Sequence, residues 1–226
     1  MYHPIRFILW SALLAAVSTG CQSTTESEEW HLQALPAAAL DIPASPDGAP
    51  QIAILAGGCF WTVEAVFEHV KGVEDGVNGY AGGTAATAHY DMILSGSTNH
   101  AESVRITFRP SQITYGQILH VFFSAAHDPT QIDSQYPDSG PEYRSEIFYA
   151  NEEQRKVALA YIAQLDDARI LPKRIATRVD PLDAFYPAEV EHQNYLAQHR
   201  SEAYIVSFGL PKLVTLERFF PERYRP

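Results

Sequence analysis

Hydrophobic and polar residues follow two periods along this chain. A continuous apolar run at residues 52–56 predicts a buried strand, and strict alternation at residues 102–108 predicts a strand with one face in the core. Apolar positions three and four residues apart predict helices over residues 62–70, 114–127 and 152–168. Further strands are expected at residues 73–80, 145–150 and 175–179. The expected order is therefore strand, helix, strand, followed by strand, helix, strand, helix, strand.

This order favours an α+β fold with few strands and short connections. We expect a two-layer α/β sandwich of the ferredoxin-like, split β-α-β type. Residues 51–226 are predicted to form one domain with an irregular C-terminal extension from about residue 201, where alternating and helical fragments mix. The Gly-rich stretch at residues 81–99 and the polar stretch at residues 133–144 are expected to be loops.

The first 50 residues have a different composition from the rest. Residues 1–21 hold a short basic start, an apolar segment too short to span a membrane, and small residues before Cys21, which predicts a signal peptide. Its end resembles a bacterial lipobox, with Ser18 where Leu is usual, so Cys21 is expected to carry a lipid; ordinary cleavage and an uncleaved anchor stay open. Residues 22–50 predict a flexible tether. The protein is then exported to the periplasm or cell envelope and anchored to a bacterial membrane.

Charge narrows the classes of partner. The 226 residues carry 16 Lys and Arg against 27 Asp and Glu, a net charge of −11, and no basic tract. Such a chain is a poor candidate for binding nucleic acid. With 46% hydrophobic residues it has enough apolar material for a core.

Cys59 lies where the strand at residues 52–56 meets the helix at residues 62–70. The unpaired N–H groups of a helix N-terminus favour a thiolate, which is the nucleophilic form of cysteine. Phe60 and Trp61 follow directly and can wall an apolar pocket. The chain has two cysteines, so lipidation of Cys21 leaves Cys59 as the sole thiol of an exported protein, and catalysis would explain it.

Glu102 begins the alternating strand and shares the parity of its apolar residues. A carboxyl on a core-facing row has a raised pKa, which suits a general acid near neutral pH. The alternative is that Glu102 lies beyond the strand end and points to water.

Three other chemistries receive little support. No His-Glu-x-x-His or Cys-x-x-Cys motif is present, so we predict no metal site. The Gly79–Gly83 stretch lacks the Lys-Ser/Thr of a nucleotide loop and predicts a turn. A Cys-His hydrolase with His100 as base lacks a recognisable oxyanion-hole pattern.

Several motifs occur in a fixed order between residues 51 and 199. They are Gly57-Gly58-Cys59-Phe60-Trp61 with Glu64, Gly79-Tyr80-Ala81-Gly82-Gly83 before His89-Tyr90, His100-Ala101-Glu102-Ser103-Val104, His127-Asp128-Pro129, Asp138 to Ser145, Phe185 to Glu189, and His192 to Leu196. Together they resemble the signature of the peptide methionine sulfoxide reductase A family. The resemblance implies that Cys59 attacks the sulfoxide sulfur and Glu102 protonates the leaving oxygen. Tyr90 and Tyr143 would bond that oxygen, and Asp138 would help hold the site.

The resemblance also implies the substrate and the product. Phe60 and Trp61 would accept the S-methyl group of the S epimer of methionine sulfoxide, free or in oxidised proteins, as in protein repair under oxidative stress. The product would be methionine and a sulfenic acid on Cys59. A lipoprotein that binds oxidised partners without turnover and a peroxide-sensing thiol protein are the alternatives.

Many family members carry resolving cysteines near the C-terminus, but residues 201–226 contain none. We therefore expect a single-cysteine enzyme without a bound cofactor. An external thiol, either a thioredoxin-like reductase or a small thiol, would reduce the sulfenic acid.

Overall fold

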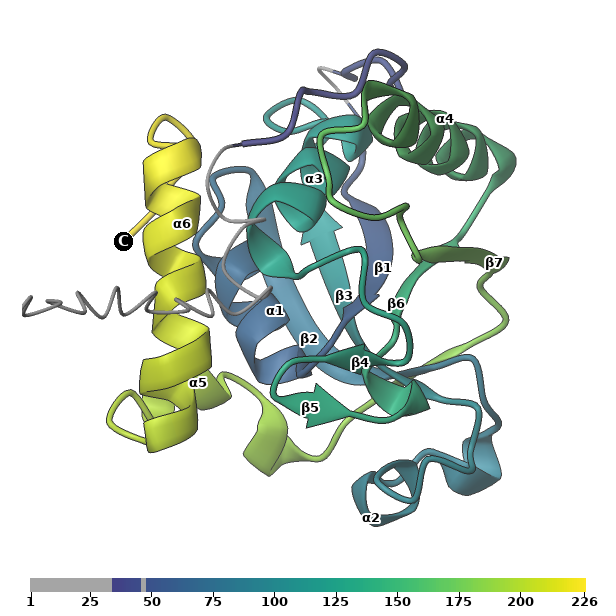
Figure 1. Ribbon diagram of the computed structural model, residues 1–226, viewed down its shortest axis with the longest axis vertical. Helices are drawn as coiled ribbons and strands as arrows, with labels where there is room; N and C mark the ends of the chain where they lie inside the picture. The colour runs from purple at the N-terminus through teal and green to yellow at the C-terminus, as the bar shows by residue number, and fades with distance from the viewer. Residues whose placement is uncertain (1–33, 46–47) are drawn as a thin grey trace, which may run out of the picture.

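A six-stranded sheet in the order β7-β6-β1-β3-β2-β8 forms the centre of the fold (Figure 1). The computed structural model describes residues 34–45 and 48–226. The strands of the sheet are β1 (Gln51–Gly57), β2 (Val73–Ala81), β3 (Ala101–Phe108), β6 (Ser145–Tyr149), β7 (Arg178–Pro181) and β8 (Phe185–Pro187). Only the β6–β7 pair is parallel within this sheet. A separate hairpin pairs β4 (Ser134–Gln135) with β5 (Asp138–Ser139).

Strands that follow each other in sequence are separated in the sheet. β3 lies between β1 and β2, although α1 (Phe60–Glu68) connects those two strands directly. β1 in turn lies between β3 and β6. The predicted α+β class is confirmed. The strand β8 was not predicted, because three residues are too few to show an alternation of apolar and polar positions.

The helices begin at the polar residues that the sequence offers as caps. Thr114 and Gln117 form a capping box at the start of α3 (Tyr115–Val121), and Asn151 caps α4 (Glu152–Ala168). The helix expected over residues 114–127 divides into α3 and the π-helix η3 (Phe122–Ala126). Of two further short helices, α2 (Tyr90–Ile93) lies in the stretch at residues 81–99 that was expected to be a loop, and α5 (Tyr195–Gln198) lies nearer the C-terminus.

Both faces of the central strand are buried. Ala53 and Leu55 belong to the main core with α1, α3 and α4, whereas Ile54 and Ala56 pack in a second cluster with Phe148. Burial on both faces explains why residues 52–56 read as a continuous apolar run. In β3 every residue on the same face as Glu102 is buried.

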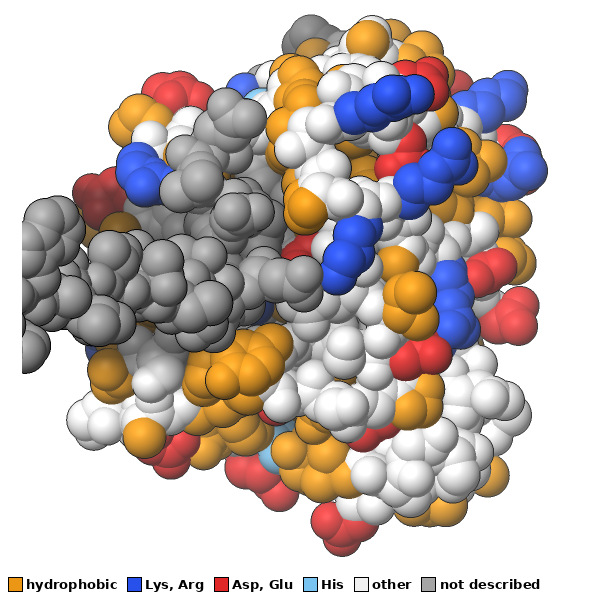
Figure 2. Space-filling view, viewed as in Figure 1, with side chains coloured by type: hydrophobic (Ala, Val, Ile, Leu, Met, Phe, Trp, Pro, Cys, Tyr) orange, Lys and Arg blue, Asp and Glu red, His pale blue; other side chains and the backbone are white. Residues whose placement is uncertain are grey.

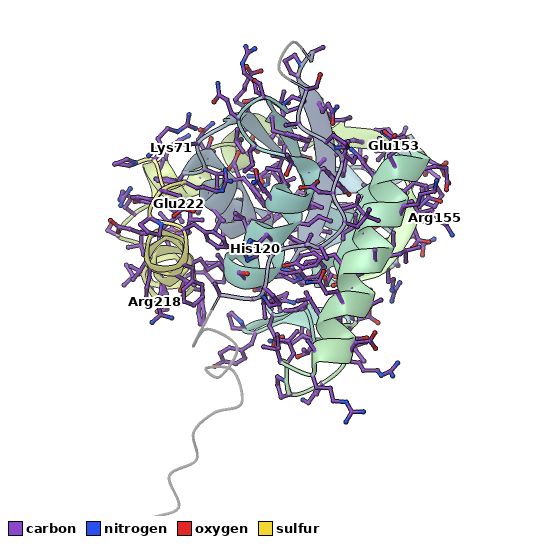
Figure 3. The ribbon with its side chains drawn as sticks, turned by 90° about the horizontal axis from the view of Figure 1, so that it is seen from above. Lys71, His120, Glu153, Arg155, Arg218 and Glu222 are labelled. Atoms are coloured by element: carbon purple, nitrogen blue, oxygen red, sulfur yellow. The ribbon has the colours of Figure 1, made fainter. Side chains whose placement is uncertain are left out.

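The C-terminal segment is helical, so the prediction of an irregular extension from residue 201 is wrong. The π-helix η6 (Ile205–Gly209) continues into α6 (Leu210–Phe219), whose Leu213 and Leu216 join the main core. Seen from above, α3 lies between α4 and α6, with His120 in the middle (Figure 3). The His120 ring meets Phe220 edge-on at 4.8 Å. Tertiary packing on α3 therefore organises a segment whose own pattern is ambiguous.

Residues 34–45 pack against the domain, so the prediction of a flexible tether over residues 22–50 is wrong for this part. Leu35 is buried, and its N–H donates to Ser124 Oγ at 3.2 Å. Tyr161 Oη donates to the Pro36 carbonyl at 2.7 Å. The predicted signal peptide, Cys21 and residues 22–33 lie outside the described residues.

Asp41 attaches this segment to the start of α3 through hydrogen bonds. Its carboxylate accepts hydrogen bonds from Thr114 Oγ1 and, at 2.6 Å, from the Gly116 N–H in the first turn of α3. We expect Asp41→Ala to lower the free energy of unfolding by about 1–2 kcal/mol, because α3 loses an N-terminal carboxylate partner. Urea denaturation would measure this loss. Asp183→Ala, at an exposed loop position, is the matched control and should change stability by less than about 0.5 kcal/mol. Equal stabilities of the two variants would contradict the prediction.

No helix among residues 34–45 and 48–226 is long and apolar enough to cross a membrane. On the visible part of the face in Figure 2, basic and acidic side chains are interspersed, so the net negative charge is not gathered there.

Candidate functional site

Cys59 is the N-cap residue of α1 and follows β1 after a tight turn. Gly58 has a φ of +85°, and a Cβ there would lie 2.5 Å from the Gln135 side chain, so both backbone and space require glycine. The thiol is free and 7% exposed. The predicted strand-to-helix position of Cys59 is therefore confirmed.

Burial dominates the electrostatics of this thiol. Removal from water raises the pKa of Cys59, and the carboxyls of Glu102 and Asp138 raise it further. A hydrogen bond with Tyr204 and the Trp61 backbone N–H lower the pKa of the thiol. The helix N-terminus acts in the direction expected from the sequence, but the net shift is upward. Burial therefore outweighs the effect of the helix N-terminus in the resting site.

Glu102 lies beside this turn and is 2% exposed. Its Oε2 accepts a hydrogen bond from the Phe60 N–H at 2.9 Å. Burial raises the pKa of Glu102 to about 8, against the lowering effect of the Phe60 N–H, with Asp138 and Glu142 adding to the rise. A neutral carboxyl is therefore available near pH 7. The alternative that Glu102 points to water is wrong.

The structure brings Tyr90, Tyr143 and Asp138 to the same place. Tyr90 starts α2, Tyr143 ends the short helix η4 (Pro141–Tyr143), and Asp138 starts β5. Burial raises the pKa of each tyrosine, and the charges of Glu102, Asp138 and Cys59 raise both further. All three side chains are thus half-buried around the pair of thiol and carboxyl. Two neutral phenols and a second carboxyl face the same small volume.

Aromatic rings form one wall of the site. The Phe60 ring stacks on Tyr90, with centroids 6.4 Å apart, and the Trp61 ring stacks on Tyr195 at 3.7 Å. The Trp61 indole N–H donates to His192 Nδ1 at 3.3 Å, which fixes the indole plane. Phe60 is buried and Trp61 half-buried. Trp61 is therefore the partly exposed ring of an aromatic cluster next to Cys59, and Phe60 is its buried neighbour.

Two further residues belong to the site but were not among the residues predicted from the sequence. Tyr204 donates to Asp138 Oδ2 at 2.5 Å and comes from the C-terminal segment, where no pattern marks it. Glu189 accepts from the Tyr90 N–H at 3.1 Å and from Tyr80 Oη at 2.7 Å. Glu189 belongs to a motif that the resemblance includes, which was the available signal. Cys21, the expected lipidation residue, lies outside the described residues.

The Cys-His hydrolase receives no support from the geometry. His100 is buried, and its ring nitrogens contact the backbone of the adjoining loop, Nδ1 at Gly83 N (3.3 Å) and Nε2 at Thr84 O (3.1 Å). Both nitrogens are thus engaged away from Cys59, and burial lowers the pKa of the ring. Within the described ranges no three His, Cys, Asp or Glu side chains gather as metal ligands do.

The family model described as peptide methionine sulfoxide reductase matches residues 51–220. Among similar proteins, peptide methionine sulfoxide reductase MsrA 2 of Mesorhizobium japonicum is 49% identical over 185 residues, which cover 82% of this chain and 94% of that protein. MsrA 2 of Synechocystis is 48% identical over 172 residues, 76% of this chain and 78% of the relative. MsrA of Thermus thermophilus is 44% identical over 176 residues, 78% of this chain and 98% of the relative.

Solved structures agree with these matches. The reduced form of Mxr1 from Saccharomyces cerevisiae is 30% identical, with a TM-score of 0.62 over 68% of this chain and 87% of that one. Methionine sulfoxide reductase A of Corynebacterium diphtheriae is also 30% identical, with a TM-score of 0.59 over 77% of this chain and 91% of that one. The similarity thus extends over most of the described domain.

Proposed function

This chain belongs to the peptide methionine sulfoxide reductase family, and from that premise we propose how its residues carry out the reaction. The protein is an oxidoreductase that reduces methionine sulfoxide to methionine. One observation carries the assignment of roles: a buried thiol, Cys59, lies beside a buried carboxyl, Glu102, whose pKa of about 8 keeps it neutral near pH 7.

In the proposed reaction Cys59 Sγ attacks the sulfoxide sulfur while Glu102 donates a proton to the sulfoxide oxygen. The attack forms a transient bond between Sγ and the substrate sulfur, and this bond and the S–O bond then break as the hydroxyl group passes to Sγ. Overall, the Sγ–H bond of the enzyme and the S–O bond of the substrate break, and Sγ–O and O–H bonds form. Two electrons pass from the Cys59 sulfur to the substrate sulfur, and Glu102 regains its proton from the thiol. The products are methionine and a sulfenic acid on Cys59.

The remaining site residues orient the substrate in this proposal. Tyr90 and Tyr143 donate hydrogen bonds to the sulfoxide oxygen, and burial that keeps both phenols neutral supports this role. Asp138, which accepts from Tyr204, holds the hydrogen-bond network. Phe60 and Trp61 receive the S-methyl group against their rings. We propose the S epimer as substrate, in line with the family resemblance.

The second half of the cycle needs thiols from outside the chain. A first thiol attacks the sulfenic acid, releasing water and forming a mixed disulfide, and a second thiol releases the Cys59 thiol and a disulfide product. The chain holds no further cysteine besides Cys21, which supports an external donor. A thioredoxin-like reductase or a small thiol fits this requirement, and no bound cofactor takes part.

We also propose the cellular context and the finer fold type. A signal peptide over residues 1–21, lipidation of Cys21 and export to the cell envelope are supported by the sequence alone. Oxidised proteins at a bacterial membrane would then be substrates. For the fold, the order β6-β1-β3-β2 supports a ferredoxin-like core with two split β-α-β units.

A single-turnover experiment tests the proposal. Full-length protein, reduced and freed of reductant, should convert methionine sulfoxide to about one methionine per chain, with a trappable sulfenic acid on Cys59. Added dithiothreitol should then give many turnovers. A protein that binds the sulfoxide but forms no methionine would be a binding protein instead. One that reacts with peroxide but leaves methionine sulfoxide unchanged would be a sensor, and either outcome would overturn the proposal.

A further inference from the structure

Lys212 reaches the Cys59 turn from the C-terminal segment. It lies in α6, and its Nζ donates to Thr62 Oγ1 at 2.8 Å. Thr62 Oγ1 in turn donates to the Cys59 carbonyl at 2.9 Å. Thr62 is buried, so the ammonium is held at the first turn of α1, one hydroxyl away from the Cys59 backbone.

The surroundings of Lys212 are suited to a cation beside a developing anion. Burial lowers the pKa of Lys212 to about 8, while the charges of Cys59 and Asp138 raise it. The hydrogen-bond acceptor of its ammonium, Thr62 Oγ1, is neutral. Lys212 is half-buried, and an ammonium that is partly removed from water is stabilised by nearby negative charge. Cys59 and Asp138 are the two groups that can supply negative charge to Lys212, and Cys59 is negative only as a thiolate.

The other titratable groups around Cys59 act against its ionisation or are neutral at pH 7. They are two carboxyls and four phenols, five of them on β3, β5, α2, η4 and α5 and one just before η6: Glu102, Asp138, Tyr90, Tyr143, Tyr195 and Tyr204. The carboxyls raise the pKa of the thiol, and burial raises it more. A nearby cation opposes both effects. His127, which also interacts with Lys212, is buried and neutral, with its pKa lowered to about 3.

We propose that Lys212 is a positioning residue of the reaction, whose ammonium, fixed by Thr62, stabilises the Cys59 thiolate that attacks the sulfoxide. The inference rests on the proposed role of Cys59 as nucleophile. When the thiol ionises, the Sγ–H electron pair stays on sulfur and Lys212 stays protonated as the thiolate's partner. The thiol proton replaces the one that Glu102 gives to the sulfoxide oxygen or, in the free enzyme, passes to water. The helical C-terminal segment, which has no cysteine, thus contributes a charge to the site.

Alkylation of Cys59 by iodoacetamide tests this without any sulfoxide, so its outcome is independent of turnover. The rate is followed against pH in the full-length protein by mass spectrometry of the Cys59 peptide, which separates it from Cys21. We expect Lys212→Met to slow alkylation at pH 7 about tenfold and to move the midpoint up by about one pH unit, since only the thiolate reacts. Lys212→Arg should stay within about threefold of the wild type, because the charge remains.

Lys156→Met is the matched control, because it removes the same charge from an exposed position on α4 and should leave the alkylation profile unchanged. An unaltered profile in Lys212→Met would overturn the proposal, as would equal shifts in Lys212→Met and Lys212→Arg, which indicate a packing role. If circular dichroism shows that Lys212→Met does not fold, Thr62→Val replaces it. That variant frees the ammonium from its acceptor and should slow alkylation about threefold; an unchanged rate would overturn the proposal.

Discussion

Cys59→Ser is expected to abolish methionine formation, a loss on the order of 10⁵-fold or more in kcat. Serine has nearly the same shape, so the turn after Gly58 and the contacts of α1 should persist. Its hydroxyl, however, is a far weaker nucleophile toward sulfur and cannot carry the oxygen as a reducible sulfenic acid. Methionine release in the presence of dithiothreitol, followed by chromatography, measures the loss.

The second cysteine of the chain provides the control for this experiment. Cys21→Ser removes the other sulfur, and in detergent solution its turnover per folded chain should equal that of the wild type. Retained activity in Cys59→Ser, or loss of activity in Cys21→Ser, would show that the nucleophile has been assigned to the wrong residue.

Glu102→Gln is expected to lower kcat by about 10²- to 10⁴-fold and to change the pH profile. The neutral form of Glu102 donates the proton, and its pKa is about 8, so the wild-type rate should fall as the pH rises through that value. Glutamine keeps the acceptor for the Phe60 N–H but has no acidic proton. The remaining slow reaction should therefore lack the decline above about pH 8. Rates measured from about pH 6 to about pH 10 would show this.

Glu64 offers a matched comparison. It is also buried, and burial raises its pKa to about 8, but its carboxylate accepts hydrogen bonds from Asn78 Nδ2 at 2.7 Å and from the Asn194 N–H. Glu64→Gln should keep the decline near pH 8. If this variant loses the decline and Glu102→Gln retains it, the general acid is not Glu102.

Elements with a strong local signal could be predicted from the sequence. The helix at residues 152–168 has a cap, a clear period and a left-handed Arg169 at its end, and its predicted bounds are those observed. The alternation in residues 102–108 places Glu102 on the buried row, as the structure shows. Both features depend on residues a few positions away in the sequence, and the pattern of apolar and polar residues reveals contacts over that distance.

Features that depend on distant contacts could not be predicted. Residues 34–45 have the composition of a linker, yet Leu35 and Asp41 find partners on η3 and α3. The π-helix η6 and α6 form against the rest of the core, although their own pattern is mixed. Such packing is invisible to a window of neighbouring residues.

In the candidate site, too, residues with a local signal could be predicted and residues brought in by distant contacts could not. Cys59, Phe60 and Trp61 are adjacent in sequence, so a single motif identifies them. Tyr204 and Lys212 meet the site only through the fold, and neither belongs to a motif that we identified. The direction of the pKa shift of Cys59 was also beyond the sequence, because burial and the charges of Glu102 and Asp138 come from separate elements.

If Cys21 carries the proposed lipid, the packed segment at residues 34–45 limits how far the enzyme can travel from the membrane. With Cys21 as the proposed lipid attachment, the stretch before the packed segment is residues 22–33, which span roughly 40 Å at most when fully extended. If residues 22–50 were all free, that limit would be roughly 100 Å. With that proposed anchor, the enzyme would act in a thin layer next to the bilayer. Under this proposal, damaged proteins at the membrane surface, rather than those throughout the surrounding compartment, would be the substrates within its reach.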